Sequence, residues 1–421
     1  MEVLENVFSP LWWDEFLEKT NNMSEPGAFY NCMPSEETAL MRTYILEILA
    51  RLAHMRTSKY GYRVYLKGVL LDGNGMEKIY DLPPLPGETL EQWVVRAFGE
   101  QKFGMIINQG ERFNLELSKL IALKIQPYLA KTGIPTEGLI YTLFIGNYDS
   151  TPLGIHKDLP GKSVMHFHLG PGAKTMYTWD DEVFADDVQK TYKSKPLELF
   201  TPLAKKHIFN EGDIYFMPEN MYHIGTQEGL SIGIACWSYN RSNVDFAKRL
   251  LGLTIENFLQ PSDVMLKPDR NKLDDSSGLE KTLELYKLPE DYKNLSFDDT
   301  LKEVYRDLRY SLHSNSGYRT SPFTRDKDYS FQLSTKVEIE KPYRIIYKET
   351  KDGTMLNVFV RGIKVEFKNF SCIKTFLDEI NKGAVNTAAE LLGSLDPEWP
   401  DRIGFYLLNL LYLHHGISII S

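Results

Sequence analysis

The chain has 421 residues, 43% of them hydrophobic and 25% charged, which is typical of a soluble globular protein with two or three domains. Its formal net charge of −9 disfavours a general nucleic-acid-binding protein. No apolar run approaches the roughly 18 residues of a membrane span, and the N-terminus lacks the basic region of a signal peptide. The three widely spaced cysteines predict reduced thiols in a cytoplasmic protein.

The first third of the chain predicts helices that surround little β-structure. After an irregular segment over 1–30, Ser35 caps a helix whose apolar residues recur at helical spacing. The expected elements are a helix over 35–54, a strand over 63–71 ending at a turn over 72–75, and helices over 90–98 and 115–129.

From Gly138 the pattern changes to short β-rich segments separated by glycines. The expected strands are 139–145, 164–169, 175–179, 213–217 and 231–239. Several short strands with turn signals between them predict a β-sandwich or small barrel.

The last 180 residues are mostly helical in pattern. Asn243 caps a helix to about residue 259, and 260–330 is charged and helix-prone. Further expected elements are paired strands at 343–347 and 356–360, a strand at 365–367, and helices over 371–381, 387–395 and 402–413.

Two separated motifs carry the chemistry. His156 and Asp158 stand two apart, so on a strand they project from one face and grip one ion together. A second block, 211–223, ends in His223. Two histidines and one carboxylate on three corners of an octahedron form the facial triad of non-haem Fe(II) oxygenases, which leaves three positions for ligand and O2.

The second block also fits the second cupin motif through Gly212, Pro218 and His223, with Asn220 in place of the middle glycine. Asn is one of the few residues that tolerate positive φ. The first cupin motif fits less well: 166–168 supplies His-x-His, but no Glu follows. An ordinary cupin site of three His and one Glu is therefore disfavoured.

Residues 139–240 resemble the JmjC domain of Fe(II)- and 2-oxoglutarate-dependent oxygenases, especially the bacterial ribosomal oxygenases and the asparaginyl hydroxylase of the hypoxia response. The likeness rests on the His-x-Asp at 156–158, on the block 211–223 and on the strand 229–237. It implies that His156, Asp158 and His223 are the metal ligands and catalytic residues.

The resemblance also implies residues for 2-oxoglutarate. In the family, a basic residue two after a glycine binds the far carboxylate, which indicates Lys174 here. The spacing is about three residues longer than usual, so Lys162 remains a rival. Tyr141 and Thr142 face opposite ways on a strand, and Thr142 is preferred as a hydroxyl donor, with Asn147 as a further polar candidate.

The order of the chain resembles the ribosomal oxygenases as well. It implies an α+β protein with a double-stranded β-helix core (1–245) carrying N-terminal helices, a helical dimerisation segment (246–330) and a winged-helix-like domain (331–421). A closed homodimer is expected. Because 331–421 contains 11 basic and 11 acidic residues, nucleic acid is an unlikely partner of that domain, and a scaffold or docking role is preferred.

The implied activity is hydroxylation of an aliphatic carbon in a protein or peptide side chain, with Fe(II), 2-oxoglutarate and O2 and release of succinate and carbon dioxide. The alternatives are the same chemistry on a free amino acid or small metabolite, a catalytically silent JmjC-like binding protein, and a metal cupin such as an isomerase. His166 and His168 either line the pocket or pack. His207 is expected at the surface, and 414–415 at the end of a buried helix.

Overall fold

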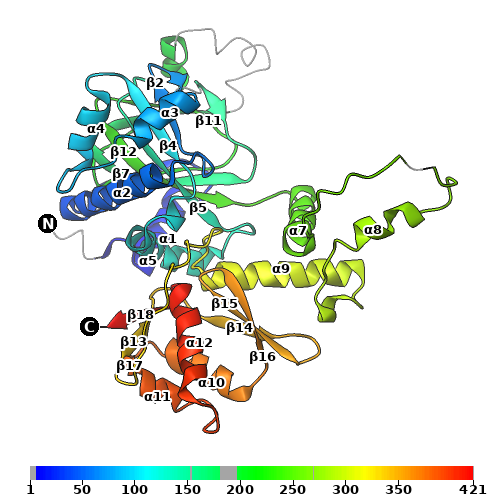
Figure 1. The fold of residues 1–421 in the computed structure, drawn as a ribbon. Helices are drawn as coiled ribbons and strands as arrows, with labels where there is room; N and C mark the ends of the chain where they lie inside the picture. Colours follow the sequence, from blue (N-terminus) through cyan, green and yellow to red (C-terminus); the bar gives the residue numbers. More distant parts are fainter. Residues whose placement is uncertain (1–5, 152–153, 181–196, 269, 421) are drawn as a thin grey trace.

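The computed structural model describes residues 6–151, 154–180, 197–268 and 270–420. Figure 1 shows two sheets and the N-terminal helices in the upper part and the C-terminal elements in the lower part. Helix α9 lies over the C-terminal elements, and the segment that carries α7 and α8 projects to one side. None of the described helices is long and apolar enough to cross a membrane.

Among the described residues, the upper part contains an eight-stranded and a four-stranded sheet, both antiparallel. The larger sheet, in spatial order, consists of β1 (Gly27–Phe29), β10 (Ile214–Met217), β7 (Lys162–Pro171), β12 (Ser231–Tyr239), β5 (Leu139–Gly146), β4 (Phe103–Ile107), β2 (Arg63–Leu66) and β3 (Val69–Leu70). The smaller sheet consists of β6 (His156–Lys157), β11 (Tyr222–Gln227), β8 (Lys174–Trp179) and β9 (Lys205–Phe209).

Both sides of the larger sheet are covered, and β7 and β12 are buried along most of their length. Side chains of the N-terminal helices pack on one side: α1 (Pro10–Lys19), α2 (Ser35–Met55), α3 (Gly73–Tyr80), α4 (Leu90–Phe98) and α5 (Leu115–Thr132). A smaller cluster joins the two sheets, with Met176 and Phe209 from the smaller one and Val164, Tyr215 and Met217 from the larger one. A sheet with apolar side chains on both faces is held between two layers.

The chain then forms α7 (Asn243–Phe258), α8 (Glu280–Leu283) and α9 (Phe297–Ser314). The C-terminal part has its own core and consists of β13 (Lys336–Ile339), β14 (Ile346–Glu349), β15 (Met355–Val360), β16 (Ile363–Lys368), α10 (Ser371–Asn381), β17 (Asn386–Thr387), α11 (Ala388–Leu392), α12 (Asp401–Leu413) and β18 (Ile417–Ile420). The expected pairing of 343–347 with 356–360 corresponds to β14 and β15, which are antiparallel.

Three sequence-based expectations about the N-terminal part were wrong. The segment 1–30 contains α1, whose start is fixed by Ser9 and Pro10 in the N-cap and first helical positions. The strand expected over 63–71 is a hairpin, because Lys67 and Gly68 both have positive φ, as a tight two-residue turn requires. The turn expected over 72–75 begins α3 instead, where the Asp72 carboxylate accepts the Gly75 N–H at 2.8 Å.

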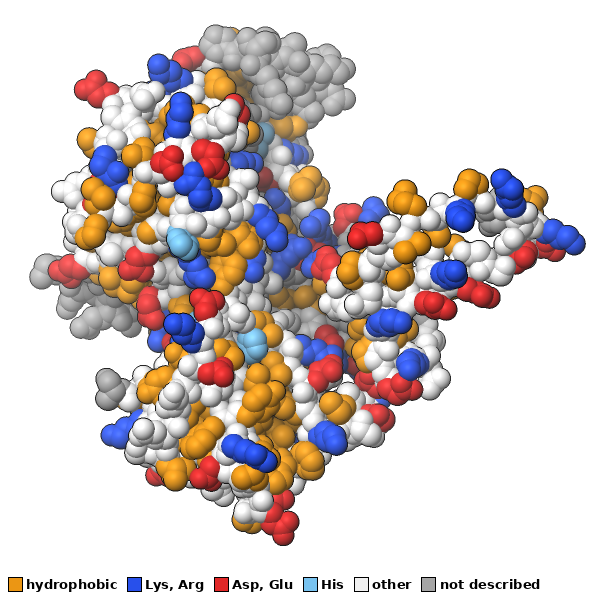
Figure 2. Space-filling view, viewed as in Figure 1, with side chains coloured by type: hydrophobic (Ala, Val, Ile, Leu, Met, Phe, Trp, Pro, Cys, Tyr) orange, Lys and Arg blue, Asp and Glu red, His pale blue; other side chains and the backbone are white. Residues whose placement is uncertain are grey.

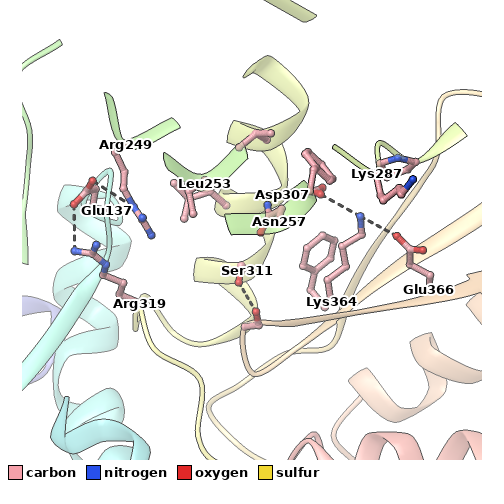
Figure 3. Close-up of a pocket in the computed structure, with 16 residues that line it drawn as sticks. Glu137, Arg249, Leu253, Asn257, Lys287, Asp307, Ser311, Arg319, Lys364 and Glu366 are labelled. Carbon is pink, nitrogen blue, oxygen red and sulfur yellow. Dashed lines mark hydrogen bonds and ion pairs between the residues drawn. The ribbon is translucent and has the colours of Figure 1, made fainter. Parts of the chain in front are cut away.

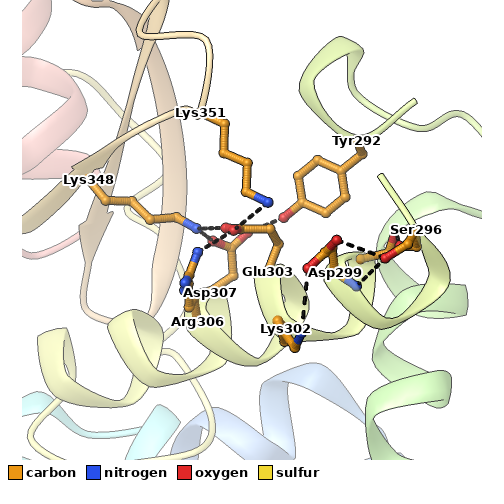
Figure 4. Close-up of polar contacts among 10 residues, drawn as sticks. Tyr292, Ser296, Asp299, Lys302, Glu303, Arg306, Asp307, Lys348 and Lys351 are labelled. Carbon is orange, nitrogen blue, oxygen red and sulfur yellow. Dashed lines mark hydrogen bonds and ion pairs between the residues drawn. The ribbon is translucent and has the colours of Figure 1, made fainter. Parts of the chain in front are cut away.

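Polar side chains join α9 to the C-terminal strands (Figure 4). The Lys348 ammonium lies 2.5 Å from Asp307 and 3.2 Å from Glu303, and all three side chains are at most 13% exposed. Burial raises the pKa of Glu303. The hydrogen bond and charge of Lys348, together with the charges of Arg306 and Lys351, lower it by a larger amount, so the pKa lies below its usual value. The network therefore depends on Lys348 remaining in place.

We expect Lys348→Met to lower the free energy of unfolding by about 1–3 kcal/mol, because it removes the cation shared by two buried carboxylates. The loss is limited because Glu303 keeps Arg306 and Lys351 as partners and Asp307 keeps Lys364. Urea denaturation measures the change. Lys302→Met on the same helix is the control, since Lys302 and its partner Asp299 are well exposed, and it should change stability by less than about 1 kcal/mol. The contribution from Glu303 should be complete above about pH 4.5 and lost as the pH falls below it. Equal effects of the two substitutions would contradict this account.

Candidate active site

A cavity of about 250 Å³ is lined by residues of both sheets. Its walls include His156, Asp158 and His223, together with Lys174 and Thr142, so the structure brings together five of the six site residues predicted from the sequence. Polar and charged side chains converge on this cavity among apolar ones, as in sites that bind a small polar ligand.

The two histidines meet through strand pairing. Strands β6 and β11 are antiparallel, with His223 directly opposite His156, and the two ring centres are 4.3 Å apart. Directly opposed residues project from the same face of a sheet, so both imidazoles face the cavity. The strand pair thus places two nitrogen ligands side by side.

Backbone carbonyls hold both rings in the same way. Nδ1 of His156 lies 2.9 Å from the Gly154 carbonyl oxygen, and Nδ1 of His223 lies 3.0 Å from that of Met221. A neutral imidazole that donates its Nδ1–H to a carbonyl carries its lone pair on Nε2. This arrangement of a second hydrogen bond behind the ring is typical of metal-binding histidines.

Asp158 completes the group. Its Oδ2 lies 3.8 Å from Nε2 of His223, is buried, and has no hydrogen-bond partner. A buried carboxylate oxygen without a partner is costly, and a cation would satisfy it. Burial and the nearby charge of His156 lower the pKa of His223 to about 4, although Asp158 opposes this, so the imidazole is neutral at pH 7 as metal binding requires.

The side chains of His156, Asp158 and His223 lie close together, but their ligand atoms are farther apart than in a metal site. No three His, Cys, Asp or Glu side chains in the described part of the chain are arranged tightly enough to form a complete metal site. Ligand atoms about 2.1 Å from one metal and at right angles lie about 3 Å apart, so the 3.8 Å separation has to shorten by roughly 0.8 Å. Side-chain rotation alone covers such a distance. The donor set of two neutral imidazoles and one carboxylate fits a divalent metal.

Lys174 supplies an unpaired cation in the same cavity. Its side chain is 5% exposed, and burial lowers its pKa to about 8. No carboxylate in the described part of the chain pairs with its ammonium, which lies 5.5 Å from the centre of the Phe144 ring. A buried ammonium without a counter-ion fits an anionic ligand.

Gly225 determines where Lys174 reaches. Strand β8 pairs with β11 so that Lys174 lies opposite Gln227, two residues beyond Gly225. A Cβ placed on Gly225 would lie only 3.2 Å from Cε of Lys174 and 3.3 Å from Oγ1 of Thr151. The missing side chain lets the lysine lie back along β11 in the direction of His223.

We therefore expect Gly225→Ala to displace the ammonium and to weaken a ligand carboxylate bound there by roughly fivefold, about 1 kcal/mol. Calorimetric titration with 2-oxoglutarate measures the loss. Gly73→Ala is the matched control, because an added Cβ there would meet nothing within 4 Å. If the two variants bind equally well, Gly225 does not position Lys174.

Of the uncharged residues considered for cosubstrate binding, one lines the cavity and two do not. Thr142 lines the cavity, and its hydroxyl donates to Oδ1 of Asn108 at 3.1 Å. Tyr141 faces the opposite side, 3.3 Å from the Ser118 hydroxyl, as the strand alternation predicted. The structure does not bring Asn147 to the cavity: its amide accepts the Phe103 N–H and donates to the Gln101 carbonyl, which ties β5 to the start of β4.

The other histidines have different roles. His166 lines the cavity, and burial together with the charge of Lys174 lowers its pKa far below the usual value. His168 packs instead, with Nε2 2.8 Å from the Gly172 carbonyl oxygen and its ring against Phe209. His207 was expected at the surface, but it is half-buried, with its ring 5.2 Å from that of Tyr215.

Several further cavity residues were not singled out from the sequence as site residues, among them Arg63, Asn108, Tyr148, Trp237 and Tyr239. Arg63 lies on β2, and Asn108 follows β4 directly. Only the pairing of β4 with β5 brings both to the site, and β4 was not among the expected strands. For Tyr239 a signal existed, since it ends the strand expected over 231–239.

Comparisons with known proteins give structural neighbours only; no protein-family model and no curated protein matches the chain. The chain is similar to YcfD, a ribosomal oxygenase from Escherichia coli, with a TM-score of 0.48, 14% identity and coverage of 97% of this chain and 98% of that chain. For a structure of YcfD in complex with cobalt and 2-oxoglutarate, the TM-score is 0.47 and the identity 13%, with coverage of 97% of this chain and 98% of that chain. For SnoK, a non-haem α-ketoglutarate-dependent carbocyclase of nogalamycin biosynthesis, the TM-score is 0.32 and the identity 13%, with coverage of 60% of this chain and 93% of that chain.

These neighbours belong to the class of protein that the sequence motifs resemble. Their TM-scores are below 0.5 and their identities are below 15%, so a function for this chain has to be inferred from the cavity itself.

Proposed function

We propose that the protein is an Fe(II)- and 2-oxoglutarate-dependent oxygenase that hydroxylates an aliphatic carbon of a protein or peptide side chain. One observation carries the proposal: two histidines with fixed Nε2 lone pairs and a carboxylate with an unsatisfied oxygen share a small cavity with a buried, unpaired lysine. The first three groups suit a divalent metal, and the lysine suits a dianionic cosubstrate.

In this proposal, His156, Asp158 and His223 hold the metal on one side and leave the remaining positions open. Lys174 binds the far carboxylate of 2-oxoglutarate, and the Thr142 hydroxyl becomes a second donor for it when it turns from its present acceptor, Oδ1 of Asn108. Bound Fe(II) supplies the redox chemistry that couples decarboxylation of 2-oxoglutarate by O2 to hydroxylation, with release of succinate and carbon dioxide. The apolar wall, including Met176 and Phe144, excludes water from the site.

The fold proposal follows the same line. The two facing antiparallel sheets are interpreted as the halves of a double-stranded β-helix, within a domain over 1–245. Residues 246–330 form a helical segment, and 331–421 a winged-helix-like domain. Support comes from the separate core of the C-terminal part, with α10, α11 and α12 beside short antiparallel strands.

The test of function is an anaerobic titration with Fe(II) and 2-oxoglutarate, followed by exposure to air and measurement of succinate. Succinate formation above that of a His223→Ala variant is expected. Ligand binding without succinate, for every peptide and amino acid offered, would instead favour a catalytically silent binding protein. Turnover with free amino acids and with no peptide would favour a small-metabolite oxygenase.

The homodimer stays a prediction, and exposed apolar side chains support it. On α7, Leu251 and Ile255 are exposed, and the segment that follows exposes Val264, Met265 and Leu266. Such a set of neighbouring apolar residues usually marks an interface. We expect light scattering at micromolar concentration to give twice the chain mass, and Leu251→Asp with Ile255→Asp to give a monomer. A monomeric unsubstituted protein would contradict this prediction.

A further inference from the structure

The active-site cavity has more positive charge than the proposed reaction uses. Among the described residues, its wall contains three cationic side chains, Arg63, Lys162 and Lys174, and a single acidic one, Asp158. The proposed function requires a divalent metal and 2-oxoglutarate in this site. The two positive charges of the metal then balance the two negative charges of the cosubstrate, and the charge of Lys174 balances that of Asp158. Arg63 and Lys162 then remain as two uncompensated cations.

Neither of these two side chains has an acidic partner in the part of the chain that the structure describes. Arg63 is half-buried on β2, and its Nε is buried without a hydrogen-bond partner. Lys162 is half-buried on β7, with its ammonium 5.4 Å from the Trp237 ring and 5.1 Å from the Tyr239 ring. Desolvated cations without counter-ions favour an anionic group between them.

The positive charge continues outside the cavity around Tyr239. Besides Lys162, the guanidinium groups of Arg319 and Arg241 lie 5.7 Å and 6.0 Å from this ring. Tyr239 itself lines the cavity, so one aromatic side chain connects the active site to the two arginines.

A buried carboxylate holds these arginines and a third one in place. Glu137 is 1% exposed and lies 3.0 Å from Arg241, 3.2 Å from Arg319 and 3.7 Å from Arg249. One carboxylate cannot neutralise three guanidinium groups. Among the described residues, Glu256 also pairs with Arg249 at 2.9 Å, and Asp245 adds negative charge near Arg241. Both carboxylates are exposed, so solvent screens them and they offset the arginines only in part.

Arg249 and Arg319 open into a second cavity of about 480 Å³, between α7, α9 and the hairpin of β15 and β16 (Figure 3). Figure 2 shows Lys and Arg side chains gathered in the recess between the upper part of the molecule and the projecting segment. We call Lys162, Arg241, Arg249 and Arg319 the basic strip. It leads from the active-site cavity to this second cavity.

From this arrangement we propose that the substrate is an acidic polypeptide segment. A carboxylate on or beside the residue to be hydroxylated lies between Arg63 and Lys162, and further acidic residues lie along the basic strip. This inference rests on the proposed function for the hydroxylation step alone. The arrangement of charged side chains, which carries the binding of an acidic segment, does not depend on that reaction. A basic segment would be repelled by the same groups.

A polypeptide is favoured over a nucleic acid for two reasons. Arg63 and the basic strip supply five cations, fewer than the roughly six to ten phosphate contacts of a protein with strongly salt-dependent nucleic-acid binding. The chain as a whole also carries a net charge of −9, which repels a long polyanion but not a short acidic segment that fits between the arginines.

The test is direct binding of fluorescein-labelled ten-residue oligomers, measured by fluorescence anisotropy without iron or 2-oxoglutarate. The probes are oligoglutamate, oligoglutamine, oligolysine and oligouridylate. Oligoglutamate is expected to bind best and to weaken as salt rises. Arg63→Gln and Lys162→Gln should each weaken it about tenfold, as expected for the loss of one charge-assisted hydrogen bond. Lys382→Gln, an exposed lysine on the C-terminal part, is the control and should change nothing.

Three results would overturn the proposal: tightest binding of oligolysine, tightest binding of oligouridylate, or equal oligoglutamate binding by the Arg63→Gln, Lys162→Gln and unsubstituted proteins. Thermal melting verifies that each variant is folded, and Arg63→Lys should retain part of the affinity because the charge survives. The succinate assay separates this inference from the proposed function. Loss of oligoglutamate binding in the variants without any succinate from the unsubstituted protein would support the acidic ligand and reject the oxygenase.

Discussion

Asp158→Ala is expected to abolish succinate formation, with a loss of well over a hundredfold. Removing even an outer-shell partner of a metal ligand costs about 10- to 100-fold in activity or metal affinity. Asp158 supplies the only carboxylate among the described residues that line the cavity. Two neutral imidazoles without a carboxylate hold Fe(II) weakly. Asp149→Ala is the matched control, because Asp149 is a well-exposed carboxylate outside this cavity.

Stability should change in a direction that distinguishes a ligand from a structural residue. The Asp158 carboxylate is mostly buried and one oxygen lacks a partner, so its removal should leave the metal-free protein as stable as before, or more so. Added Mn(II) should raise the melting temperature of the unsubstituted protein and not that of Asp158→Ala, since a ligand stabilises only the state that binds it. A marked loss of stability in the metal-free variant would assign Asp158 a structural role instead.

The sequence was sufficient to predict that His156, Asp158 and His223 share one cavity, because the geometry of the two motifs is local. His156 and Asp158 are two apart, and strand alternation puts both on one face whatever the rest of the fold does. The return of His223 follows from a strand, a turn and a second strand, with Asn220 adopting the positive φ that the motif requires. Prediction of their meeting needed only the assumption that β11 pairs with β6.

The rest of the cavity depends on contacts that no local pattern encodes. Arg63 and Asn108 come from an N-terminal extension of the larger sheet, and only the pairing of β2, β4 and β5 brings them in. Asn147 shows the opposite error: it is polar and follows a strand that lines the site, but its amide is taken up by the backbone near β4. The charge surplus therefore became visible only in three dimensions.

The fold was predictable to the same extent. Helices with clear apolar periodicity, such as α2 and α5, lie close to their expected positions. Ser35 does not cap α2 as expected: Pro34 holds the N-cap position without a side-chain hydrogen bond, and Ser35 is the first helical residue. The wrong predictions concern sequence patterns that are compatible with two local structures, and Asp72 is the best example. An Asp followed by glycines suits both a hairpin turn and a helix N-cap, and the neighbouring sheet pairing decides between them.

Lys174→Ala is expected to weaken 2-oxoglutarate by about 10- to 150-fold, which corresponds to the roughly 1.5–3 kcal/mol of a hydrogen bond to a charged group. The physical reason is that its ammonium is buried and unpaired in the cavity, so a bound carboxylate gains a partner that has lost its water. Calorimetric titration of the Mn(II)-loaded protein without O2 measures the affinity. Lys174→Arg should retain part of it.

Lys162→Ala is the matched comparison, because Lys162 lines the same cavity and was the rival candidate. Lys162 is half-buried against two aromatic rings, whereas Lys174 is almost fully buried. We expect its removal to leave 2-oxoglutarate affinity within about twofold of the unsubstituted protein. A large loss in Lys162→Ala with none in Lys174→Ala would reverse the assignment of the two lysines.

The pH dependence gives an independent measurement of the same residue. Burial lowers the pKa of Lys174 to about 8 in the ligand-free protein, and a bound carboxylate raises it again. Affinity for 2-oxoglutarate should therefore be constant between about pH 6.5 and 8 and fall by up to tenfold per pH unit above 8, as binding then requires uptake of a proton. Lys174→Arg should lose this dependence, because its guanidinium stays charged over the whole range. An unchanged pH profile in Lys174→Arg would show that another group controls binding.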